Sequence, residues 1–276
     1  MTPPAIRRRL ERLADRNGVI RVLAIDHRDS LRAVLEPDDP DLVTDDDLRA
    51  IKIDLARAAR GRATGVMLDP AVGMDAPVVA AVPAELSIIA AVEAQGYLAE
   101  DSVTHTTLLD GWDATIASAR GADAVKLLAL WAGSPSPEQS RVIDAAVTDA
   151  GAAGLPLVLE PLPRGLPSTG PWVLDWAAAH AGSGADLFKL PYPGSADACR
   201  ELTEMLPGPW ALLSAGAGFD PFCDQLTTAL RAGAAGYIVG RAVWREAAVR
   251  DPDSRREAIA ELVVPRLEAL IAIEPS

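Results

Sequence analysis

Short apolar segments recur along the whole chain, and a polar or charged residue stands near the end of most of them. The eight segments are RVLAID (21–26), GVMLD (65–69), LSIIAAVE (86–93), AVKLLALW (124–131), LPLVLEP (155–161), DLFKLPY (186–192), WALLSAG (210–216) and GYIVGR (236–241). Their length and apolar content are typical of strands that are buried in a parallel sheet. The pattern therefore predicts eight strands.

Amphipathic, alanine-rich stretches separate these segments. Those at 137–154, 171–184 and 221–236 begin at proline and end in glycine, which are favoured at the first turn and just past the end of a helix. Strands that alternate with helices predict an α/β fold, a (β/α)8 TIM barrel. We expect a single domain over residues 1–276 that starts with a surface helix. An open doubly wound sheet is the competing architecture, but the first turn, DHRDS, lacks its glycine-rich dinucleotide motif.

Length and charge narrow the classes of function. The chain has 276 residues, close to the roughly 250 of one barrel, and a net charge of -13. An acidic protein lacks the basic surface that nucleic acid or an anionic membrane requires, so we expect neither as a partner. Two cysteines without metal-ligand spacing, and no long apolar run, predict a cytoplasmic protein. A small diffusible substrate is the expected partner.

Polar residues at the ends of the predicted strands are the candidates for chemistry, because active sites of such barrels lie at those ends. They are Asp26, Asp69, Glu93, Lys126, Glu160, Lys189, Ser214 and Arg241. The chain has only three lysines, and two of them, Lys126 and Lys189, lie inside apolar runs. Strand alternation predicts that Lys189 shares a face with Leu187, and Lys126 with Ala124.

Two buried lysines near carboxylates have both a structural and a functional interpretation. A lysine paired with an acid can simply fill a barrel interior, yet burying several charges is costly unless their interaction has a use. A second ammonium group and partial removal from water both favour the neutral amine that attacks a carbonyl. The sequence therefore favours Lys189 as a nucleophile beside Lys126. Asp69 and Glu93 could equally cap neighbouring loops, so neither is predicted to be catalytic.

The last two strands suggest an anion site. Ser214 and Gly216 follow the seventh strand, and Gly240 and Arg241 follow the eighth. Loops after these strands commonly bind phosphate through backbone N–H groups, and an arginine adds a charge-assisted contact. Glycine pairs also serve ordinary turns, which leaves a purely structural interpretation open.

Metal chemistry is not expected from this sequence. The chain has three histidines, His27, His105 and His180, and the last of these lies in a helical stretch away from the strand ends. A catalytic zinc site needs convergent ligands. We therefore expect no metal and no other cofactor.

Seven segments together resemble the class I aldolases of the DeoC/LacD group. They are LAIDHRDSLR, VMLDP, DAVKLLALW, LEPLPR, GADLFKLPYPG, PWALLSAG and GYIVGRAVW, and they cover most of the chain in the same order. The resemblance is to the tagatose-1,6-bisphosphate aldolases and, more closely, to the sulfofructosephosphate aldolases of sulfoquinovose breakdown. It implies a (β/α)8 barrel, a sugar phosphate as the substrate and a homo-oligomer.

The resemblance also implies roles for individual residues. It implies a Schiff-base lysine at Lys189 that forms an iminium with the C2 ketone of a phosphorylated ketose, and a proton shuttle at Glu160. Lys126 would tune the nucleophile, and Asp26 would orient substrate hydroxyls or hold Lys126. The products would be dihydroxyacetone phosphate and an aldehyde, either glyceraldehyde 3-phosphate or sulfolactaldehyde. The substrate phosphate would meet the residues after strands seven and eight.

The sequence departs from the family at two positions beside this site. His27 stands where the family commonly has glutamine, and Pro191 stands two residues after the lysine, where an acidic residue is common. These departures leave the sugar open. Two other functions are compatible with the sequence. One is another Schiff-base or anion-binding barrel enzyme, such as a transaldolase, a deoxyribose-phosphate aldolase or a heptulosonate synthase, and the other is a non-catalytic barrel that senses a sugar phosphate.

Overall fold

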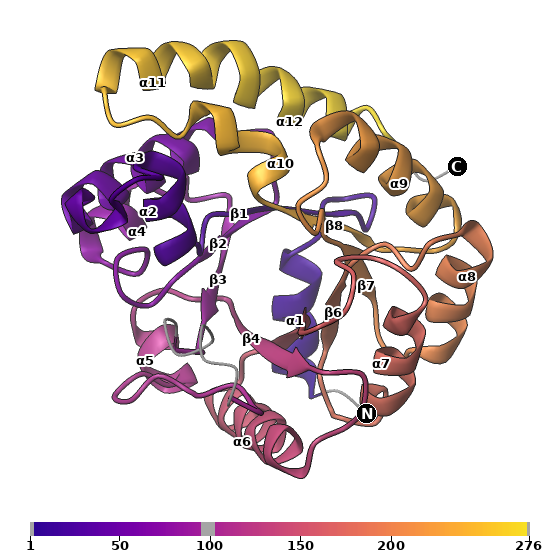
Figure 1. Cartoon of the computed structure of the whole chain (residues 1–276). Helices are drawn as coiled ribbons and strands as arrows, with labels where there is room; N and C mark the ends of the chain where they lie inside the picture. Colours follow the sequence, from indigo (N-terminus) through magenta and orange to yellow (C-terminus); the bar gives the residue numbers. More distant parts are fainter. Residues whose placement is uncertain (1–2, 95–102, 275–276) are drawn as a thin grey trace.

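The computed structural model describes residues 3–94 and 103–274, and these fold into a closed parallel barrel (Figure 1). The strands are β1 Ile20–Ala24, β2 Gly65–Leu68, β3 Ser87–Ala91, β4 Ala124–Trp131, β5 Leu157–Pro163, β6 Leu187–Leu190, β7 Trp210–Leu212 and β8 Gly236–Val239. Each strand pairs in parallel with the next, and β8 pairs with β1. The predicted single-domain (β/α)8 TIM barrel is confirmed.

Helices surround the strands and cover the outside of the barrel (Figure 1). They are α1 Pro4–Arg12, α2 Asp29–Leu35, α3 Asp45–Ala58, α4 Ala76–Ala81, α5 Ala114–Ala119, α6 Pro137–Ala153, α7 Trp172–His180, α8 Ala196–Met205, α9 Phe219–Arg231, α10 Arg241–Trp244, α11 Pro252–Ala258 and α12 Val264–Ile271. A π-helical turn, Ile259–Val263, joins α11 to α12, and short 3-10 turns lie at Pro40–Leu42 and Arg245–Ala247. The helices expected at 137–154, 171–184 and 221–236 are α6, α7 and α9.

Helix α6 shows how the local sequence sets these boundaries. The side chain of Ser136 accepts a hydrogen bond from the Gln139 N–H, and Pro137 occupies the first turn, where its missing N–H costs nothing. Gly154 ends the helix with a left-handed φ of 68°, a conformation that glycine adopts without a steric penalty.

The last two predicted strands extend too far in the sequence interpretation. β7 ends at Leu212 and β8 at Val239, so Ser214 and Gly216 lie in a loop, and Arg241 is the first residue of α10. Ala215 and Gly216 have left-handed φ angles of 49° and 85°, which are incompatible with an extended strand. Ser214 and Arg241, which the sequence predicted to lie at strand ends, therefore belong to the segments that follow β7 and β8.

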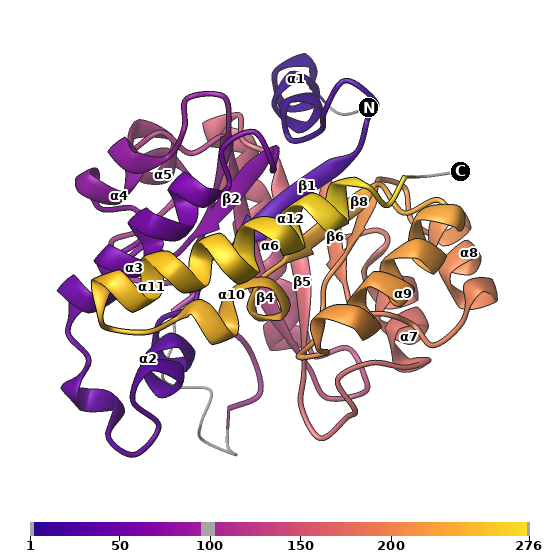
Figure 2. The ribbon, with the colours of Figure 1, turned by 90° about the horizontal axis from the view of Figure 1, so that it is seen from above.

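Side chains inside the barrel alternate with side chains that face the helices. Ala124 and Leu187 belong to the interior cluster, and Val125 and Phe188 belong to the cluster between strands and helices. The predicted sidedness of Lys126 and Lys189 follows from the same alternation. Leu13, at the end of α1, packs into the interior cluster, so the predicted N-terminal helix lies across one end of the barrel (Figures 1 and 2).

Closure between β8 and β1 depends on a glycine. Gly236 has a φ of 145°, and a Cβ added there would lie 1.9 Å from the carbonyl oxygen of Ile20, its partner in the ladder. Any side chain would force the two strands apart, so the barrel closes only around this glycine.

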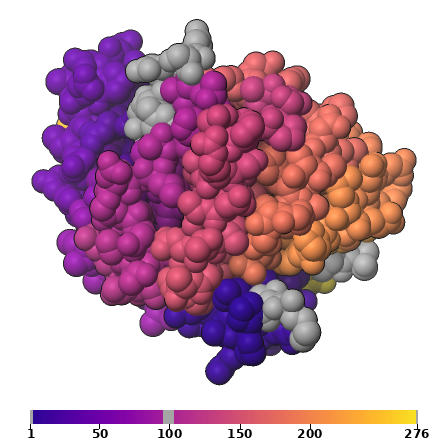
Figure 3. Space-filling view, turned by 90° about the horizontal axis from the view of Figure 1, so that it is seen from below, coloured from indigo at the N-terminus to yellow at the C-terminus, as the bar shows by residue number. Residues whose placement is uncertain are grey.

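The first and last helices, α1 and α12, lie outside the ring of strands (Figures 1 and 2). Helices α11 and α12 run along one side, where the π-helical turn between them contacts α3 and α10 (Figure 2). The opposite side is covered by α5 and α6, and α1 projects at one end (Figure 3). In residues 3–94 and 103–274, none of the helices has the length and apolar content needed to span a bilayer.

Candidate active site

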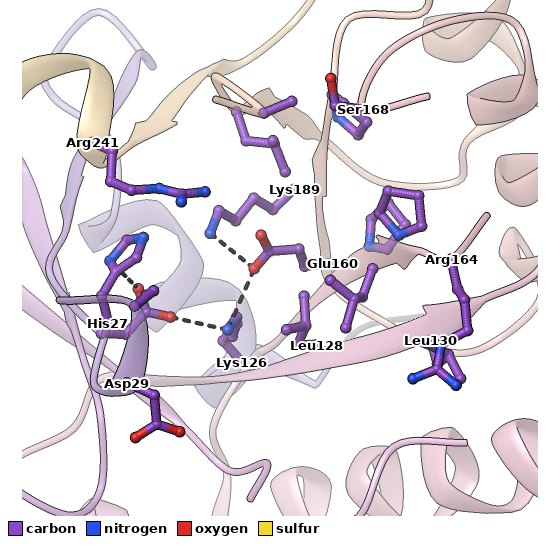
Figure 4. Close-up of a pocket in the computed structure, with 18 residues that line it drawn as sticks. His27, Asp29, Lys126, Leu128, Leu130, Glu160, Arg164, Ser168, Lys189 and Arg241 are labelled. Carbon is purple, nitrogen blue, oxygen red and sulfur yellow. Dashed lines mark hydrogen bonds and ion pairs between the residues drawn. The ribbon is translucent and has the colours of Figure 1, made fainter. Parts of the chain in front are cut away.

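A cavity of about 580 Å³ opens at the C-terminal ends of the strands (Figure 4). The four residues predicted to be catalytic, Asp26, Lys126, Glu160 and Lys189, all line it. They come from the end of β1 and from β4, β5 and β6, which are brought together by closure of the barrel. The structure therefore joins residues that are up to 163 positions apart in the sequence.

The two lysines of the cavity share one carboxylate oxygen. Lys189 Nζ lies 2.8 Å from Glu160 Oε2, and Lys126 Nζ lies 3.4 Å from the same atom. Lys126 Nζ also lies 2.9 Å from Asp26 Oδ2 (Figure 4). The side chains are 3–12% exposed, so the cluster is largely removed from water. The two lysines that the sequence placed near carboxylates therefore lie side by side at one carboxylate.

Glu93 belongs to the same cluster, although the sequence interpretation left it out. Its fully buried Oε1 lies 2.6 Å from Lys126 Nζ, and its Oε2 accepts a hydrogen bond from the Leu128 N–H at 3.2 Å. Glu93 lies four residues after the interior residue Ile89, so strand alternation places both side chains on the same face. This alternation was the signal in the sequence that could have identified Glu93. Glu93 contacts Lys126 but does not line the cavity.

Asp69 has a different role from the cavity carboxylates. Its oxygens accept hydrogen bonds from the N–H groups of Val72 and Gly73, and Oδ1 pairs with Lys52 Nζ at 2.7 Å. Lys52, the third lysine of the chain, is fully buried and also donates to the carbonyl oxygens of Ile25 and His27. Asp69 therefore caps its own loop, as one of the two sequence interpretations expected.

Of the four residues predicted to bind an anion, Arg241 lines the cavity. Ser214 and Gly216 flank Ala215, which also lines it, and the Ser214 carbonyl accepts a hydrogen bond from the Ala217 N–H at 2.9 Å. Gly240 directly precedes Arg241. The structure thus brings Arg241 to the cavity, whereas Ser214, Gly216 and Gly240 lie beside it without forming its wall.

The sequence model of the DeoC/LacD family aldolases matches residues 20–246, a span that runs from β1 to the turn after α10. The chain belongs to the DeoC/LacD family of aldolases. It is therefore an aldolase, an enzyme that cleaves carbon–carbon bonds.

Individual relatives of this aldolase are distant. The tagatose 1,6-diphosphate aldolase of Streptococcus agalactiae serotype V is 25% identical over 273 residues, covering 85% of this chain and 83% of the relative. The class 1 fructose-bisphosphate aldolase of Halobacterium salinarum is 34% identical over 141 residues, 49% of this chain and 53% of the relative. A solved Schiff-base-forming fructose-1,6-bisphosphate aldolase has a TM-score of 0.73 at 21% identity, covering 97% of this chain and 99% of that one. At this identity the structural likeness shows the barrel fold.

The aldolase holds Lys126 as an ammonium ion. Burial alone would favour the neutral amine, but the carboxylates of Asp26, Glu93 and Glu160 raise the pKa of Lys126 well above its usual value. A permanently protonated lysine cannot attack a carbonyl. By contrast, Lys189 Nζ contacts a single carboxylate and lies 3.7 Å from Met67 Sδ, so it is the better candidate for the nucleophile.

Asp26 carries a negative charge at neutral pH. Burial favours its neutral form, but the ammonium groups of Lys126 and Lys189 outweigh burial and hold the pKa of Asp26 far below its usual value. A carboxylate accepts hydrogen bonds and donates none. Asp26 can therefore bind a hydroxyl group in the cavity, and it also helps to keep Lys126 charged.

Beside Asp26, His27 is neutral. Burial lowers the pKa of His27 to about 3, with the charges of Arg241, Lys189 and Lys52 acting in the same direction and Asp26 opposing them. Its Nδ1 lies 3.6 Å from Asp26 Oδ1. The second departure from the family pattern, Pro191, also lines the cavity, so both departures lie where a substrate would contact them.

Metal ligands do not converge in the described part of the aldolase. Over residues 3–94 and 103–274, no three His, Cys, Asp or Glu side chains are arranged to hold a metal ion. His180 is buried in α7, where its ring stacks on Trp176. Cys199 and Cys223 are free thiols on α8 and α9.

Proposed function

We propose that this chain is a class I aldolase that uses Lys189 to form a Schiff base and reversibly cleaves a phosphorylated ketose to dihydroxyacetone phosphate and an aldehyde. The observation that carries the proposal is the contact between Lys189 Nζ and Glu160 at 2.8 Å, next to a second lysine held as an ammonium ion by three carboxylates. Lys189 is thereby assigned as the nucleophile, and Lys126 as a fixed positive charge beside it. The membership of the DeoC/LacD family supports the same chemistry.

The reaction begins at the C2 ketone. Lys189 passes a proton from its ammonium group to Glu160, and the resulting amine adds to the carbonyl carbon. Glu160 then donates this proton to the hydroxyl group of the carbinolamine, which leaves as water. The product is an iminium ion on Lys189, whose positive nitrogen accepts an electron pair. Glu160 contacts Lys189 directly, so it is within reach of both the nitrogen and the departing hydroxyl group.

Cleavage of the carbon–carbon bond returns a proton to Glu160. Its carboxylate takes the proton of the C4 hydroxyl, the C3–C4 electron pair moves into the iminium, and the aldehyde leaves. Glu160 returns this proton to C3 of the remaining enamine, and hydrolysis of the iminium that forms frees Lys189 and dihydroxyacetone phosphate. Asp26 orients a substrate hydroxyl as an acceptor, and Lys126 stabilises the negative charge of the carboxylates around the reacting carbons.

Arg241 is the candidate to bind the phosphate of the donor half. Within the described part of the chain, its guanidinium makes no ion pair, unlike Lys126 and Lys189. An unpaired cation in a cavity favours an anionic ligand. Ser214, Gly216 and Gly240 would act through backbone groups of the adjacent turns.

The far end of the substrate decides between related sugars. The cavity extends from Glu160 along an apolar wall that includes Leu128, Leu130 and Pro161, and Arg164 and Ser168 lie near its end (Figure 4). We propose tagatose 1,6-bisphosphate and 6-deoxy-6-sulfofructose 1-phosphate as the two substrates to test first. They share the donor half and differ in the configuration at C4 and in the terminal anion, a phosphate or a sulfonate. The predicted homo-oligomer stays a prediction.

Trapping with borohydride tests the proposed function. Incubation with dihydroxyacetone phosphate and borohydride should add the mass of the reduced donor to the peptide that contains Lys189, because borohydride reduces the iminium to a stable amine. No addition to a folded protein would remove the class I mechanism. Product analysis then separates the other Schiff-base enzymes, since a transaldolase transfers an unphosphorylated three-carbon unit. A non-catalytic sensor would bind the ligand without an imine and would tolerate Lys189→Ala.

Glu160→Gln should lower kcat about 10²-fold, because an amide can neither donate the proton for dehydration nor accept the C4 hydroxyl proton. Steady-state cleavage assays measure this loss, and borohydride trapping should show slower but detectable imine formation at Lys189. Glu138→Gln, an acid on the first turn of α6 outside the cavity, is the matched control and should retain full activity. A kcat within about threefold of the parent in Glu160→Gln would exclude Glu160 as the proton shuttle.

Arg241→Met should raise KM for phosphorylated substrates by roughly 10- to 100-fold with a smaller change in kcat, because charge-assisted hydrogen bonds contribute about 1.5–3 kcal/mol. Trapping with unphosphorylated dihydroxyacetone should be almost unaffected, since that donor has no group for Arg241 to bind. Arg245→Met, on an exposed residue outside the cavity, is the control. Equal losses with both donors would mean that Arg241 does not bind the phosphate.

A further inference from the structure

His27 is fixed in the wall of the cavity on three sides. Its Nδ1 is buried toward Asp26, and its ring meets the edge of Trp244 at a centroid distance of 5.1 Å. A Cβ added to Gly240 would lie 2.9 Å from His27 Cε1, so the backbone of Gly240 lies against that corner of the ring. The edge that contains Nε2 and Cδ2 remains; the side chain is 19% exposed and lines the cavity.

The backbone of His27 is fixed as well. Lys52 Nζ donates a hydrogen bond to the His27 carbonyl at 2.8 Å, and the same ammonium pairs with Asp69 at 2.7 Å. Trp244 Nε1 donates to the carbonyl of Ala24, two residues before Asp26. A ring held from its backbone and from two neighbouring faces has one orientation, as recognition of a substrate group requires.

The charges around His27 determine which hydrogen bonds it can make. Arg241 from α10, Lys189 from β6 and Lys52 from α3 disfavour a positive ring, and Asp26 favours one. Asp69, from the end of β2, has its charge paired with Lys52. A neutral imidazole has one N–H donor and one acceptor nitrogen. Nδ1 makes no hydrogen bond, but the negative charge of Asp26 at 3.6 Å favours the proton on Nδ1 and leaves Nε2 as the acceptor.

We propose that His27 determines the stereochemical preference of this aldolase by accepting a hydrogen bond from a hydroxyl group of the sugar at Nε2. The inference rests on the proposed function, because it assigns the hydroxyl to the ketose that Lys189 binds. A glutamine, the residue common at this position in the family, presents an amide with both donor and acceptor atoms. His27 presents a single acceptor in a fixed direction, so it discriminates between epimers whose hydroxyl groups point toward it or away from it.

Condensation provides the sharpest test, because it yields an internal ratio. Dihydroxyacetone phosphate is condensed with glyceraldehyde 3-phosphate or sulfolactaldehyde, whichever the parent enzyme uses faster, and the ratio of the product epimers at C4 is measured. His27→Leu removes the acceptor and should shift this ratio by roughly 10-fold, the effect of one lost hydrogen bond. His27→Gln should give an intermediate ratio. A partly unfolded variant loses rate, whereas its product ratio still reports on the folded fraction.

Two controls accompany this measurement. His105→Gln alters a histidine that does not line the cavity, and its product ratio should equal that of the parent. The rate of the parent and of His27→Gln should depend on pH in the same way between about pH 5.5 and 8, because a neutral acceptor does not titrate in this range.

The outcomes separate the two proposals. An unchanged product ratio in His27→Leu would overturn the role of His27. So would a change of the parent rate with a pKa near 6–7 that is lost in His27→Gln, because it would make His27 a proton-transfer group. A parent enzyme that forms no borohydride-trapped adduct at Lys189 would overturn the proposed function and this inference together. A trapped adduct with an unchanged product ratio overturns the inference alone.

Discussion

Lys189→Met should abolish aldol cleavage, with kcat reduced by more than roughly 10³-fold, the scale of loss that follows removal of a catalytic nucleophile. Met has nearly the length of Lys and no nucleophilic amine. The neighbouring Lys126 cannot replace it, because three carboxylates hold it as an ammonium ion. Cleavage assays and borohydride trapping on the same preparation measure the effect.

Lys189→Arg separates charge from nucleophilicity. A guanidinium keeps the positive charge beside Glu160 but stays protonated, so this variant should fold and be as inactive as Lys189→Met. Thermal unfolding checks that both variants retain the barrel. If Lys189→Met kept a turnover within about tenfold of the parent and a trapped adduct appeared on Lys126, the assignment of the Schiff base to Lys189 would be wrong.

Much of this site follows from one property of strands, the alternation of side chains. Because successive side chains face opposite sides, the sequence placed Lys126 with Ala124 and Lys189 with Leu187 in the barrel interior, and the structure agrees. The C-terminal ends of β1, β4, β5 and β6 lie at the same end of the barrel, because all strands of a closed parallel barrel point in one direction.

Other features depend on contacts that alternation does not describe. Lys52 lies on the buried face of α3 with Leu48 and Leu55, which helical periodicity could have indicated, but its partner Asp69 comes from a different loop. Ser214 and Arg241 looked like strand ends because apolar patterning does not show where a strand gives way to the turn or helix that follows it, as at the left-handed Ala215 and Gly216 or at the start of α10. Positions of side chains in regular elements were thus predictable, whereas contacts between loops were set by closure of the barrel.

Lys126 lies at the centre of a buried cluster of carboxylates. Lys126 Nζ lies within 3.4 Å of the carboxylates of Asp26, Glu93 and Glu160, and all of these side chains are largely buried. Lys126→Met would leave three carboxylates together with Lys189 as their remaining nearby cation. Removal of one partner from a buried ion pair costs about 3–5 kcal/mol, so we expect a destabilisation of this size at pH 7.

This destabilisation should depend on pH in a direction that identifies its cause. In the parent, the folded pKa of Asp26 lies below its ordinary 3.8, so the stability it contributes is present above that value and is lost as the pH falls through the folded pKa. In Lys126→Met, burial is no longer offset by this ammonium, and the pKa of Asp26 should rise above 3.8. The folded variant would then bind protons more tightly than the unfolded chain, and acidification from pH 7 toward pH 5 would stabilise it.

Urea unfolding of the parent and of Lys126→Met between pH 5 and 8 measures this difference. The difference in the free energy of unfolding between the parent and Lys126→Met should be largest at pH 7–8. It should become smaller toward pH 5, because protonation relieves the repulsion between the carboxylates. Lys189→Met, which breaks a contact to a single carboxylate, is the matched control and should show a smaller difference. A difference that is the same at every pH would mean that Lys126 stabilises the barrel through packing of its side chain and that its charge contributes little, which would also remove the electrostatic reason for assigning the nucleophile to Lys189.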